Sequence, residues 1–369
     1  MNTESFWDEE RQAGSFPPLD RDLEVEILVV GGGMAGVTAA YLLSAQGRSV
    51  ALVERDRIGG LNTGHTTAHL TYMTDNRLSD LIATFSRKEA RQAWEAGRAA
   101  IELVEENVKR HAIDCGFRRV PGYLVASEHC DLAHERALLQ QEAMVARQMG
   151  FDAYYLDASP VTGRPGIRFE NQAKFHPLRY LDALAREAAK QGARIYEDTE
   201  VTSFDEGAVI AGGRTVKFGQ VFLATHVPLQ GDGGMVGATL FQSKLALYTS
   251  YAVRARLPDD APPELIWSDT ADPFYYLRVE REDGGGASCI FGGEDHRTGM
   301  EAHTAHRYES LTRELEKILP GARVTHRWSG QIVEPVDGLP YIGRTSDTQL
   351  IATGFSGNGM TFGTVAGMM

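Results

Sequence analysis

Residues 26–54, EILVVGGGMAGVTAAYLLSAQGRSVALVE, predict a strand, a glycine-rich turn, a helix and a second strand in succession. In this spacing Gly31 allows a sharp turn out of the first strand, and Gly33 allows the backbone to approach a pyrophosphate closely. Gly36 allows the helix to pack against the strand, and the helix N-terminus presents free N–H groups and a positive dipole end to phosphates. The unit therefore indicates a dinucleotide-binding protein.

Other residues of the same unit support this interpretation. Glycine-rich loops are often simple turns, but here Ala40 keeps the helix thin, Gly47 marks its end and Val50 lies in the second strand. Glu54 ends that strand, where its carboxylate can accept hydrogen bonds from a ribose 2′-OH, which argues against a 2′-phosphate. The unit by itself does not distinguish NAD from FAD.

The composition excludes several classes of protein. The chain has 369 residues, enough for two domains or for one large α/β domain with an inserted module. A formal net charge of −13 argues against nucleic-acid binding. No apolar run approaches the length of a membrane span, and the acidic N-terminus has no signal-peptide character. Cys115, Cys130 and Cys289 are widely spaced, so we expect reduced thiols in a cytoplasmic protein.

The remaining sequence predicts further helices and strands. Periodic apolar residues predict helices at 87–113, 130–149, 178–191 and 304–319. Short strands within 193–225 suggest a β-meander that returns a strand to the nucleotide-binding sheet. Antiparallel strands of a second sheet are expected at 244–256, 275–280 and 288–292, with a turn at 283–286.

A second strand–glycine turn–helix unit occurs near the C-terminus. A strand at 349–352 runs into the glycine-rich turn 354–359 and the start of a helix. NAD dehydrogenases usually build the nucleotide domain from consecutive βα units, whereas assembly from both ends of the chain is more typical of a flavoprotein. The N-terminus of this second helix can lie against the pyrimidine ring of the flavin and stabilise the negative charge that the ring gains on reduction. The two units together favour FAD.

These motifs resemble a known family over nearly the whole chain. The matching segments are VVGGGMAGVTAAYLL, VALVE, FHPLRYLDALAREAAKQGARIYEDTEVTSF, FLATH, DGLPYIGR and LIATGFSGNGMTFGTVAG. They resemble the D-amino-acid/sarcosine/glycine oxidase family of FAD-dependent oxidoreductases. The resemblance implies a Rossmann-like α/β FAD domain of the glutathione-reductase type and an α+β substrate domain with an antiparallel sheet. We expect the FAD domain at 1–85, 165–240 and 325–369, and the substrate domain at 86–164 and 241–324.

One branch of the family matches best. The opening of the chain, TGHTTAHLT and WSDTADPFYYLRVE are most similar to the branch whose FAD domain is often followed by a Rieske iron–sulfur domain. The paired Cys-x-His and Cys-x-x-His ligands of a Rieske cluster do not occur in this sequence. The sequence stops inside the expected last helix, and because a helix of two turns is weakly held, we expect a truncation.

The resemblance also implies which residues hold FAD. Glu54 would bind the adenosine ribose, with Arg55 beside it, and Val201 would meet the adenine through its backbone. The pyrophosphate would be cradled by Gly31, Gly33, Met34, Ala35 and Gly36, with Ala224 and Thr225 on the strand below. The path from ribityl to flavin would be lined by Thr63, Gly64, His65, Thr66 and Thr67. The flavin ring would be surrounded by Gly354, Ser356, Gly357, Asn358, Gly359, Met360 and Thr361.

The sequence departs from the family in two places. Relatives with covalent flavin offer a cysteine near the segment 331–337, and this chain has none there. We therefore expect noncovalent FAD, although a linkage through His65 stays open. The strand that often ends in Ala-Thr-Gly ends here in a histidine, His226, which places a bulky ring near the cofactor.

Few side chains are needed for flavin-dependent amine oxidation, because the protein mainly positions the substrate Cα–H over flavin N5. Arg278 could clamp a substrate carboxylate, or it could be a solvated strand arginine. Tyr276 shares a strand face with Arg278, although tyrosines in strands more often belong to a core. His65 could orient or deprotonate an amine, or simply be a hydrogen-bonded loop residue. His69 is a weaker candidate, and His176 is expected to shape a turn before Pro177.

These observations predict an enzyme that oxidises a C–N bond of a small amine or amino acid by hydride transfer to flavin N5. Its electron acceptor stays open between oxygen, a quinone and an iron–sulfur protein. The alternatives are a 2-hydroxy-acid dehydrogenase of the same fold, a flavin-bound partner or scaffold subunit without turnover, and an NAD-dependent dehydrogenase. The histidine and acid clusters at 294–296 and 303–306 do not form a convincing metal site.

Overall fold

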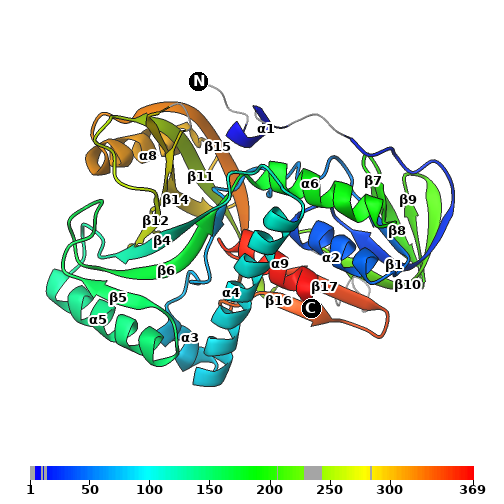
Figure 1. Ribbon diagram of the computed structural model, residues 1–369, viewed down its shortest axis with the longest axis horizontal. Helices are drawn as coiled ribbons and strands as arrows, with labels where there is room; N and C mark the ends of the chain where they lie inside the picture. The colour runs from blue at the N-terminus through cyan, green and yellow to red at the C-terminus, as the bar shows by residue number, and fades with distance from the viewer. Residues whose placement is uncertain (1–4, 10, 12–14, 206, 228–242, 283–284) are drawn as a thin grey trace.

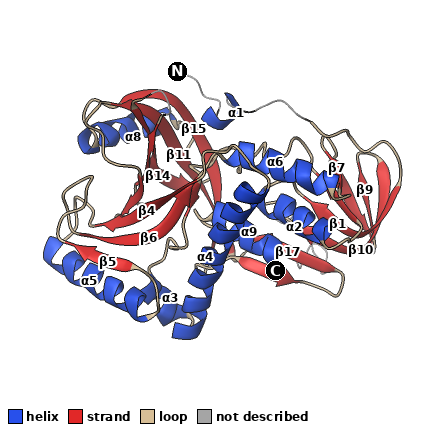
Figure 2. Ribbon diagram, in the orientation of Figure 1, coloured by secondary structure: helices blue, strands red, loops and turns tan. Residues whose placement is uncertain are grey.

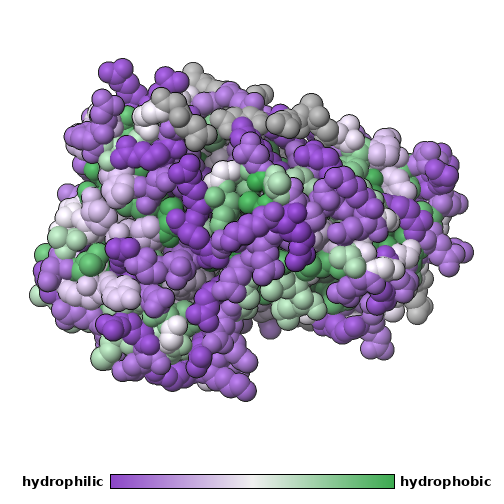
Figure 3. Space-filling view, in the orientation of Figure 1, coloured by the Kyte–Doolittle hydropathy of each residue, from purple (hydrophilic) through white to green (hydrophobic). Residues whose placement is uncertain are grey.

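The computed structural model describes residues 5–9, 11, 15–205, 207–227, 243–282 and 285–369. Two β-sheets lie side by side in an elongated molecule (Figure 1), and helices pack around both of them (Figure 2). Hydrophilic residues cover most of the face shown in Figure 3. Within the described residues, no helix is both long and apolar enough to cross a bilayer.

The first sheet draws strands from three separate parts of the chain. Its strand β1 (Leu23–Val30) pairs in parallel with β2 (Val50–Val53) and β10 (Arg214–Leu223), and β10 pairs in parallel with β17 (Gln349–Thr353). The other strands are β7 (Arg194–Tyr196), β8 (Val201–Asp205), β9 (Ala208–Ala211) and β16 (Tyr341–Arg344). This arrangement confirms the predicted discontinuous, Rossmann-like sheet.

The predicted meander is confirmed, with one correction. Strands β8, β9 and β10 pair in sequence, and β10 then joins β1. The sequence suggested two short strands where the structure has the single strand β10. β10 pairs with β1 up to its last residue, which places Ala224 and Thr225 at the carboxyl end of β1.

The second sheet is mainly antiparallel, as predicted, although β12 pairs with β4 in parallel. Its strands, in spatial order, are β15 (Arg323–Pro335), β11 (Leu245–Leu257), β14 (Ala287–Arg297), β13 (Tyr276–Arg281), β12 (Leu265–Asp269), β4 (Arg118–Val125), β6 (Gly166–Lys174) and β3 (His69–Leu70), with β5 (Ala153–Leu156) beside β6. The turn predicted at 283–286 falls partly on residues 283 and 284, which lie outside the described residues.

Strand pairing crosses the expected domain boundaries at three places. Strands β3, β6 and most of β15 come from segments expected in the FAD domain, yet they pair in the second sheet. The boundaries from the sequence therefore stay a proposal. A division by sheet would transfer these strands to the substrate domain.

The predicted helices are present, with ends that differ from the predicted ones by at most three residues. They are α2 (Met34–Ala45), α4 (Arg87–Arg110), α5 (Leu132–Gln148), α6 (Pro177–Lys190), α8 (Ala305–Ile318) and α9 (Gly359–Met368), together with the short α1 (Phe6–Glu9) and α3 (Leu78–Thr84). His176 caps α6 by accepting a hydrogen bond from the backbone N–H of Arg179, with Pro177 as the first helical residue. This capping confirms the turn predicted at His176.

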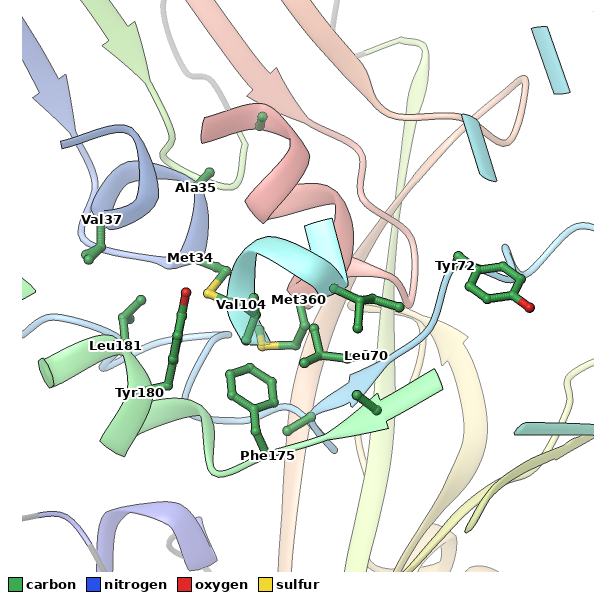
Figure 4. Packing of buried hydrophobic residues seen from close by; sticks show 14 of the residues in the cluster. Met34, Ala35, Val37, Leu70, Tyr72, Val104, Phe175, Tyr180, Leu181 and Met360 are labelled. Carbon is green, nitrogen blue, oxygen red and sulfur yellow. The ribbon is translucent and has the colours of Figure 1, made fainter. Parts of the chain in front are cut away.

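A shared hydrophobic core holds the helices that start at the glycine turns. Met34 of α2 and Met360 of α9 meet Val104 of α4, Leu70 and Phe175 (Figure 4), and all of these side chains are buried. The core thus joins α2 and α9 to helix α4 and to the edge of the second sheet. Burial of this apolar surface fixes the two helix N-termini relative to each other.

Candidate active site

A cavity of about 640 Å³ is lined by residues of both sheets and by the first residues of α2 and α9. This volume lies within the range of cofactor and ligand sites. We call the part lined by Gly31, Gly33, Glu54 and Val201 the nucleotide end. The part lined by Ser250, Tyr276, Asp295 and Glu334 is the second-sheet end.

Glycines allow close backbone contacts at the nucleotide end. Gly31 has a φ of +109°, and a Cβ there would lie 2.5 Å from the carbonyl oxygen of Ala224. A Cβ on Gly36 would lie 1.9 Å from the carbonyl oxygen of Gly31, so the helix can approach the turn only because this residue is glycine. Helix α2 begins after Gly33 without a side-chain cap, so its first N–H groups face the cavity.

Glu54 is held in place by backbone donors. Its two carboxylate oxygens accept hydrogen bonds from the N–H of Gly32, at 2.6 Å, and of Asp56, at 2.9 Å. The side chain is 8% exposed and lines the cavity near Val201. This placement suits an acid that receives ribose hydroxyl groups beside a phosphate cradle.

A carboxylate from another part of the chain holds the second glycine turn. Asp75 accepts hydrogen bonds from the N–H of Gly357 and from Nδ2 of Asn358, both at 2.8 Å. Asn358 precedes α9, whose first residues line the cavity. Asp75 also faces the cavity, and burial raises its pKa. No local pattern in the sequence indicates this contact, because Asp75 and Gly357 are far apart in the chain.

The loop before β3 is fixed from three directions. Trp7 of α1 donates its indole N–H to the carbonyl oxygen of Thr66 at 2.7 Å, and Trp328 of β15 donates to that of His65 at 3.1 Å. Arg278 of β13 donates to the carbonyl oxygens of Thr67 and Ala68. The loop between the two ends of the cavity is therefore held by buried side chains from three elements.

Comparisons with known proteins agree with this geometry. Residues 26–369 match the family model described as FAD dependent oxidoreductase. The chain belongs to this family. Its N-terminal glycine turn, its C-terminal glycine turn and the sheet between them therefore form an FAD-dependent oxidoreductase fold.

Among curated proteins, the chain is 29% identical over 370 residues to the putative Rieske 2Fe-2S iron-sulfur protein YhfW of Bacillus subtilis, covering 98% of this chain and 71% of that protein. It is 25% identical to the gamma-glutamylputrescine oxidoreductase of Escherichia coli, covering 96% of this chain and 84% of that protein. Among solved structures, glycine oxidase from Geobacillus kaustophilus has a TM-score of 0.73 at 20% identity, covering 94% of this chain and 93% of that one. L-proline dehydrogenase from P. horikoshii has a TM-score of 0.73 at 19% identity, covering 94% of this chain and 92% of that one. These structural matches establish the fold.

Most residues predicted to hold FAD line the cavity, and the geometry fits the cofactor at both glycine turns. The lining residues are Gly31, Gly33, Met34, Ala35, Glu54, Arg55, Thr63, His65, Thr66, Thr67, Val201, Ala224, Thr225, Ser356, Gly357, Asn358, Gly359 and Met360. The structure places the others behind this wall, namely Gly36, Gly64, Gly354 and Thr361. Thr361, for example, donates its hydroxyl group to the carbonyl oxygen of Thr71 at 2.9 Å.

The structure corrects the prediction that Arg278 clamps a substrate carboxylate. Arg278 is 2% exposed and lies outside the cavity wall. Its guanidinium forms an ion pair with Glu280 and donates to the carbonyl oxygen of Phe175 at 2.8 Å, in addition to the loop carbonyls. Its carbon Cζ also lies 5.2 Å from the ring centre of Trp7. Both terminal nitrogens of the guanidinium are used within the protein, and Nε is buried without a partner among the described residues, so Arg278 is a structural residue behind the site.

Tyr276 lines the cavity. Its hydroxyl group lies 2.7 Å from that of Ser250, and burial raises its pKa. His69 packs edge-on against the ring of Tyr276, with ring centres 5.9 Å apart. Burial, with a smaller effect of the Arg278 charge, lowers the pKa of His69 to about 3, so this histidine is neutral near pH 7. His226 also lines the cavity, and burial lowers its pKa to about 4.

A β-bulge turns an unpredicted carboxylate toward the cavity. The register of β11 and β14 shifts between Thr249 and Tyr251, and Glu294 has a φ of +62°. Glu294 accepts a hydrogen bond from Tyr275 at 2.8 Å, whereas the next residue, Asp295, lines the cavity. A bulge redirects side chains in this way, so strand alternation in the sequence could not indicate which acid faces the site.

The carboxylates at the second-sheet end repel one another. Burial and the charges of Asp75, Asp295 and Asp272 raise the pKa of Glu334 to about 7. Burial and the charges of Asp75 and Glu294 raise the pKa of Asp295 to about 6, against a hydrogen bond from Ser250 that lowers it. In the sequence, Asp295 belongs to the histidine and acid cluster 294–296, which does not form a convincing metal site, and no motif indicates Glu334.

Proposed function

We propose that this protein oxidises a C–N bond of a small amine or amino acid, with hydride transfer to N5 of noncovalently bound FAD. The observation that carries the proposal is a continuous cavity that runs from two glycine-turn helices to a polar pocket on the second sheet. FAD, when bound, supplies the two-electron acceptor of this reaction. Two relatives support the class, namely the gamma-glutamylputrescine oxidoreductase of Escherichia coli and a glycine oxidase of Bacillus licheniformis that is 24% identical.

In this proposal the nucleotide end holds the ADP half of FAD. The N–H groups at the start of α2 would face the pyrophosphate, and Glu54 would receive the ribose hydroxyl groups. The start of α9, held by Asp75 through Gly357, would face the flavin pyrimidine. The remaining predicted cofactor residues that line the cavity would complete the contacts.

His65 is the proposed proton acceptor for the reacting amine. Its Nδ1 lies 2.9 Å from the carbonyl oxygen of Leu61, and a carbonyl only accepts hydrogen bonds. In the neutral ring the proton therefore sits on Nδ1, and Nε2 carries the lone pair. Because His65 lines the cavity, Nε2 is available to take a proton from the substrate nitrogen.

Tyr276 and Ser250 would orient the substrate. Their hydroxyl groups are hydrogen-bonded to each other at 2.7 Å and line the second-sheet end. The neutral rings of His69 and His226 line the same cavity and add no positive charge to it at pH 7.

Spectroscopy tests the proposal directly. The purified protein should show flavin absorption bands, and acid precipitation should release the flavin into the supernatant. Anaerobic addition of small amines or amino acids should bleach the bands. Bleaching by 2-hydroxy acids alone would instead establish the hydroxy-acid dehydrogenase, and no bleaching with any of these compounds would favour a subunit without turnover. A protein without flavin bands that binds NAD would overturn the cofactor assignment.

A further inference from the structure

The charge at the second-sheet end of the cavity indicates which charge the substrate has. Asp75, Asp295 and Glu334, which we call the acidic wall, all face the cavity. The arginines that line the cavity within the described residues are Arg55 and Arg77, and they form ion pairs with Asp56 and Glu135. No lysine among the described residues lines it.

Neither Arg278 nor the residues outside the described structure add a positive side chain to the lining of this pocket. Arg278, the arginine expected there, is buried behind the wall in an ion pair with Glu280. The residues outside the described part of the structure are 1–4, 10, 12–14, 206, 228–242 and 283–284, and their sequence contains no lysine, arginine or histidine. The carboxylate of an amino-acid substrate would thus meet negative charge without a cationic partner.

Donors from the protein leave part of the acidic wall unsatisfied. Asp295 accepts a hydrogen bond from Ser250, but its buried Oδ1 has no hydrogen-bond partner among the described residues. The side chain of Glu334 receives no hydrogen bond or ion pair from the described residues, and its described charged neighbours are the carboxylates of Asp75, Asp295 and Asp272. Carboxylates gathered without a cation are unfavourable, so an ammonium group of a ligand beside them would stabilise their charges.

The reaction itself decides which nitrogen the acidic wall holds. Hydride transfer breaks the Cα–H bond and forms a C=N bond, and the reacting nitrogen must first give up a proton. A carboxylate beside that nitrogen would stabilise its protonated form and oppose the reaction. The acidic wall therefore favours oxidation only when it binds a second nitrogen of the same substrate.

We propose that the substrate is a small diamine or polyamine without a carboxylate, whose distal ammonium group binds to Asp295 and Glu334. This inference rests on the proposed function and narrows its substrate class. Asp75 adds negative charge to the same pocket while it holds the second glycine turn through Gly357. Asp295 and Glu334 are specificity-determining residues in this proposal, because they bind the end of the substrate that does not react.

Anaerobic titration of the FAD-loaded protein tests the proposal with 1,4-diaminobutane, 1-aminobutane, glycine and 4-aminobutanoate as probes. The half-saturating concentration for bleaching should be at least about tenfold lower for 1,4-diaminobutane than for 1-aminobutane. Glycine and 4-aminobutanoate should bleach the flavin more weakly than either. Stronger bleaching by glycine or 4-aminobutanoate would overturn the inference and leave the proposed amine oxidation standing. If none of the four reduces the flavin, both proposals fail.

Substitutions in the acidic wall test whether these residues cause the preference for 1,4-diaminobutane over 1-aminobutane. Asp295→Asn and Glu334→Gln should each raise the half-saturating concentration of 1,4-diaminobutane about tenfold and leave that of 1-aminobutane nearly unchanged. Glu309→Gln, at an exposed position on α8, is the matched control. Glu334→Lys should shift the preference from 1,4-diaminobutane to 4-aminobutanoate. Unchanged diamine binding in both neutral variants, with normal flavin spectra, would overturn the assignment of these residues.

A binding measurement without turnover separates recognition from chemistry. Addition of 1,4-diaminobutane should raise the melting temperature of the protein, because a ligand of the folded state stabilises it. The increase should persist in Glu309→Gln and disappear in the double variant Asp295→Asn/Glu334→Gln. An equal increase in the double variant would show that the diamine binds elsewhere on this acidic protein and would overturn the proposed contact.

Discussion

At the nucleotide end of the cavity, most of the proposed ligand contacts come from backbone groups, whereas at the second-sheet end they come from side chains. The first turn of α2 follows the glycine turn directly and lines the cavity without a side-chain cap, so local sequence positions its N–H groups. Asp295 and Glu334 come from separate strands, and a bulge directs one of them. The proposed cofactor contacts therefore follow from short motifs, whereas the proposed substrate contacts depend on how distant strands are aligned.

Replacement of Arg278, which is buried behind the cavity wall, should have the greatest effect. Arg278→Met should lower the free energy of unfolding by about 3 kcal/mol, because removal of one partner from a buried ion pair costs roughly 3–5 kcal/mol. Lys174, 3.7 Å from Glu280, would offset part of this cost. Denaturant unfolding measures the change, and Arg256→Met, exposed on β11, is the control. A stable variant with weakened amino-acid binding would restore the carboxylate-clamp interpretation.

Substitutions at two glycines of the nucleotide end distinguish an effect on cofactor binding from an effect on stability. Gly33→Ala should abolish flavin retention but change the unfolding free energy of the flavin-free protein by less than about 1 kcal/mol. A Cβ there meets only the hydroxyl group of Thr63, at 3.2 Å, at the cavity surface. Gly36→Ala should instead cost about 1–3 kcal/mol, because its Cβ would clash with the carbonyl oxygen of Gly31. Flavin content and unfolding curves measure both, and normal flavin content in Gly33→Ala would contradict the pyrophosphate site.

Asp75 holds the second glycine turn and is part of the acidic wall, so its replacement should affect both FAD binding and diamine binding. Asp75→Ala removes the acceptor of Gly357 and Asn358, and hydrogen bonds to a charged group contribute about 1.5–3 kcal/mol each. We expect FAD affinity to fall at least about tenfold and diamine binding to weaken as well. Equilibrium titration with FAD measures the first effect, with the exposed Asp259→Ala as control. Unchanged FAD affinity would mean that the second glycine turn holds its shape without Asp75.

The outcome at particular residues shows what the sequence could predict. Gly31 to Gly36 and Gly357 to Gly359 were recognisable, because tight turns and close backbone approach require glycine within a few residues. Asp75 was missed, because its partner Gly357 lies far away in the chain and the contact forms only when the core packs. Arg278 was misjudged, although Glu280 two residues later shares its strand face and offered a local signal for an ion pair.

The smallest expected effect is a change of stability with pH that originates at the acidic wall. The pKa of Asp295 is raised to about 6 and that of Glu334 to about 7, so between pH 4 and 7 the folded protein binds more protons there than the unfolded chain does. Their contribution to stability is therefore present at low pH and is lost as the pH rises through 6 and 7. In Glu334→Gln the melting temperature should fall less between pH 5 and 8 than in the unmodified protein, whereas Glu309→Gln should follow the unmodified protein. A steeper fall of the melting temperature in Glu334→Gln would contradict mutual repulsion within the acidic wall. In the unmodified protein, saturating 1,4-diaminobutane should reduce the fall of the melting temperature, because the bound ammonium group neutralises the same charges.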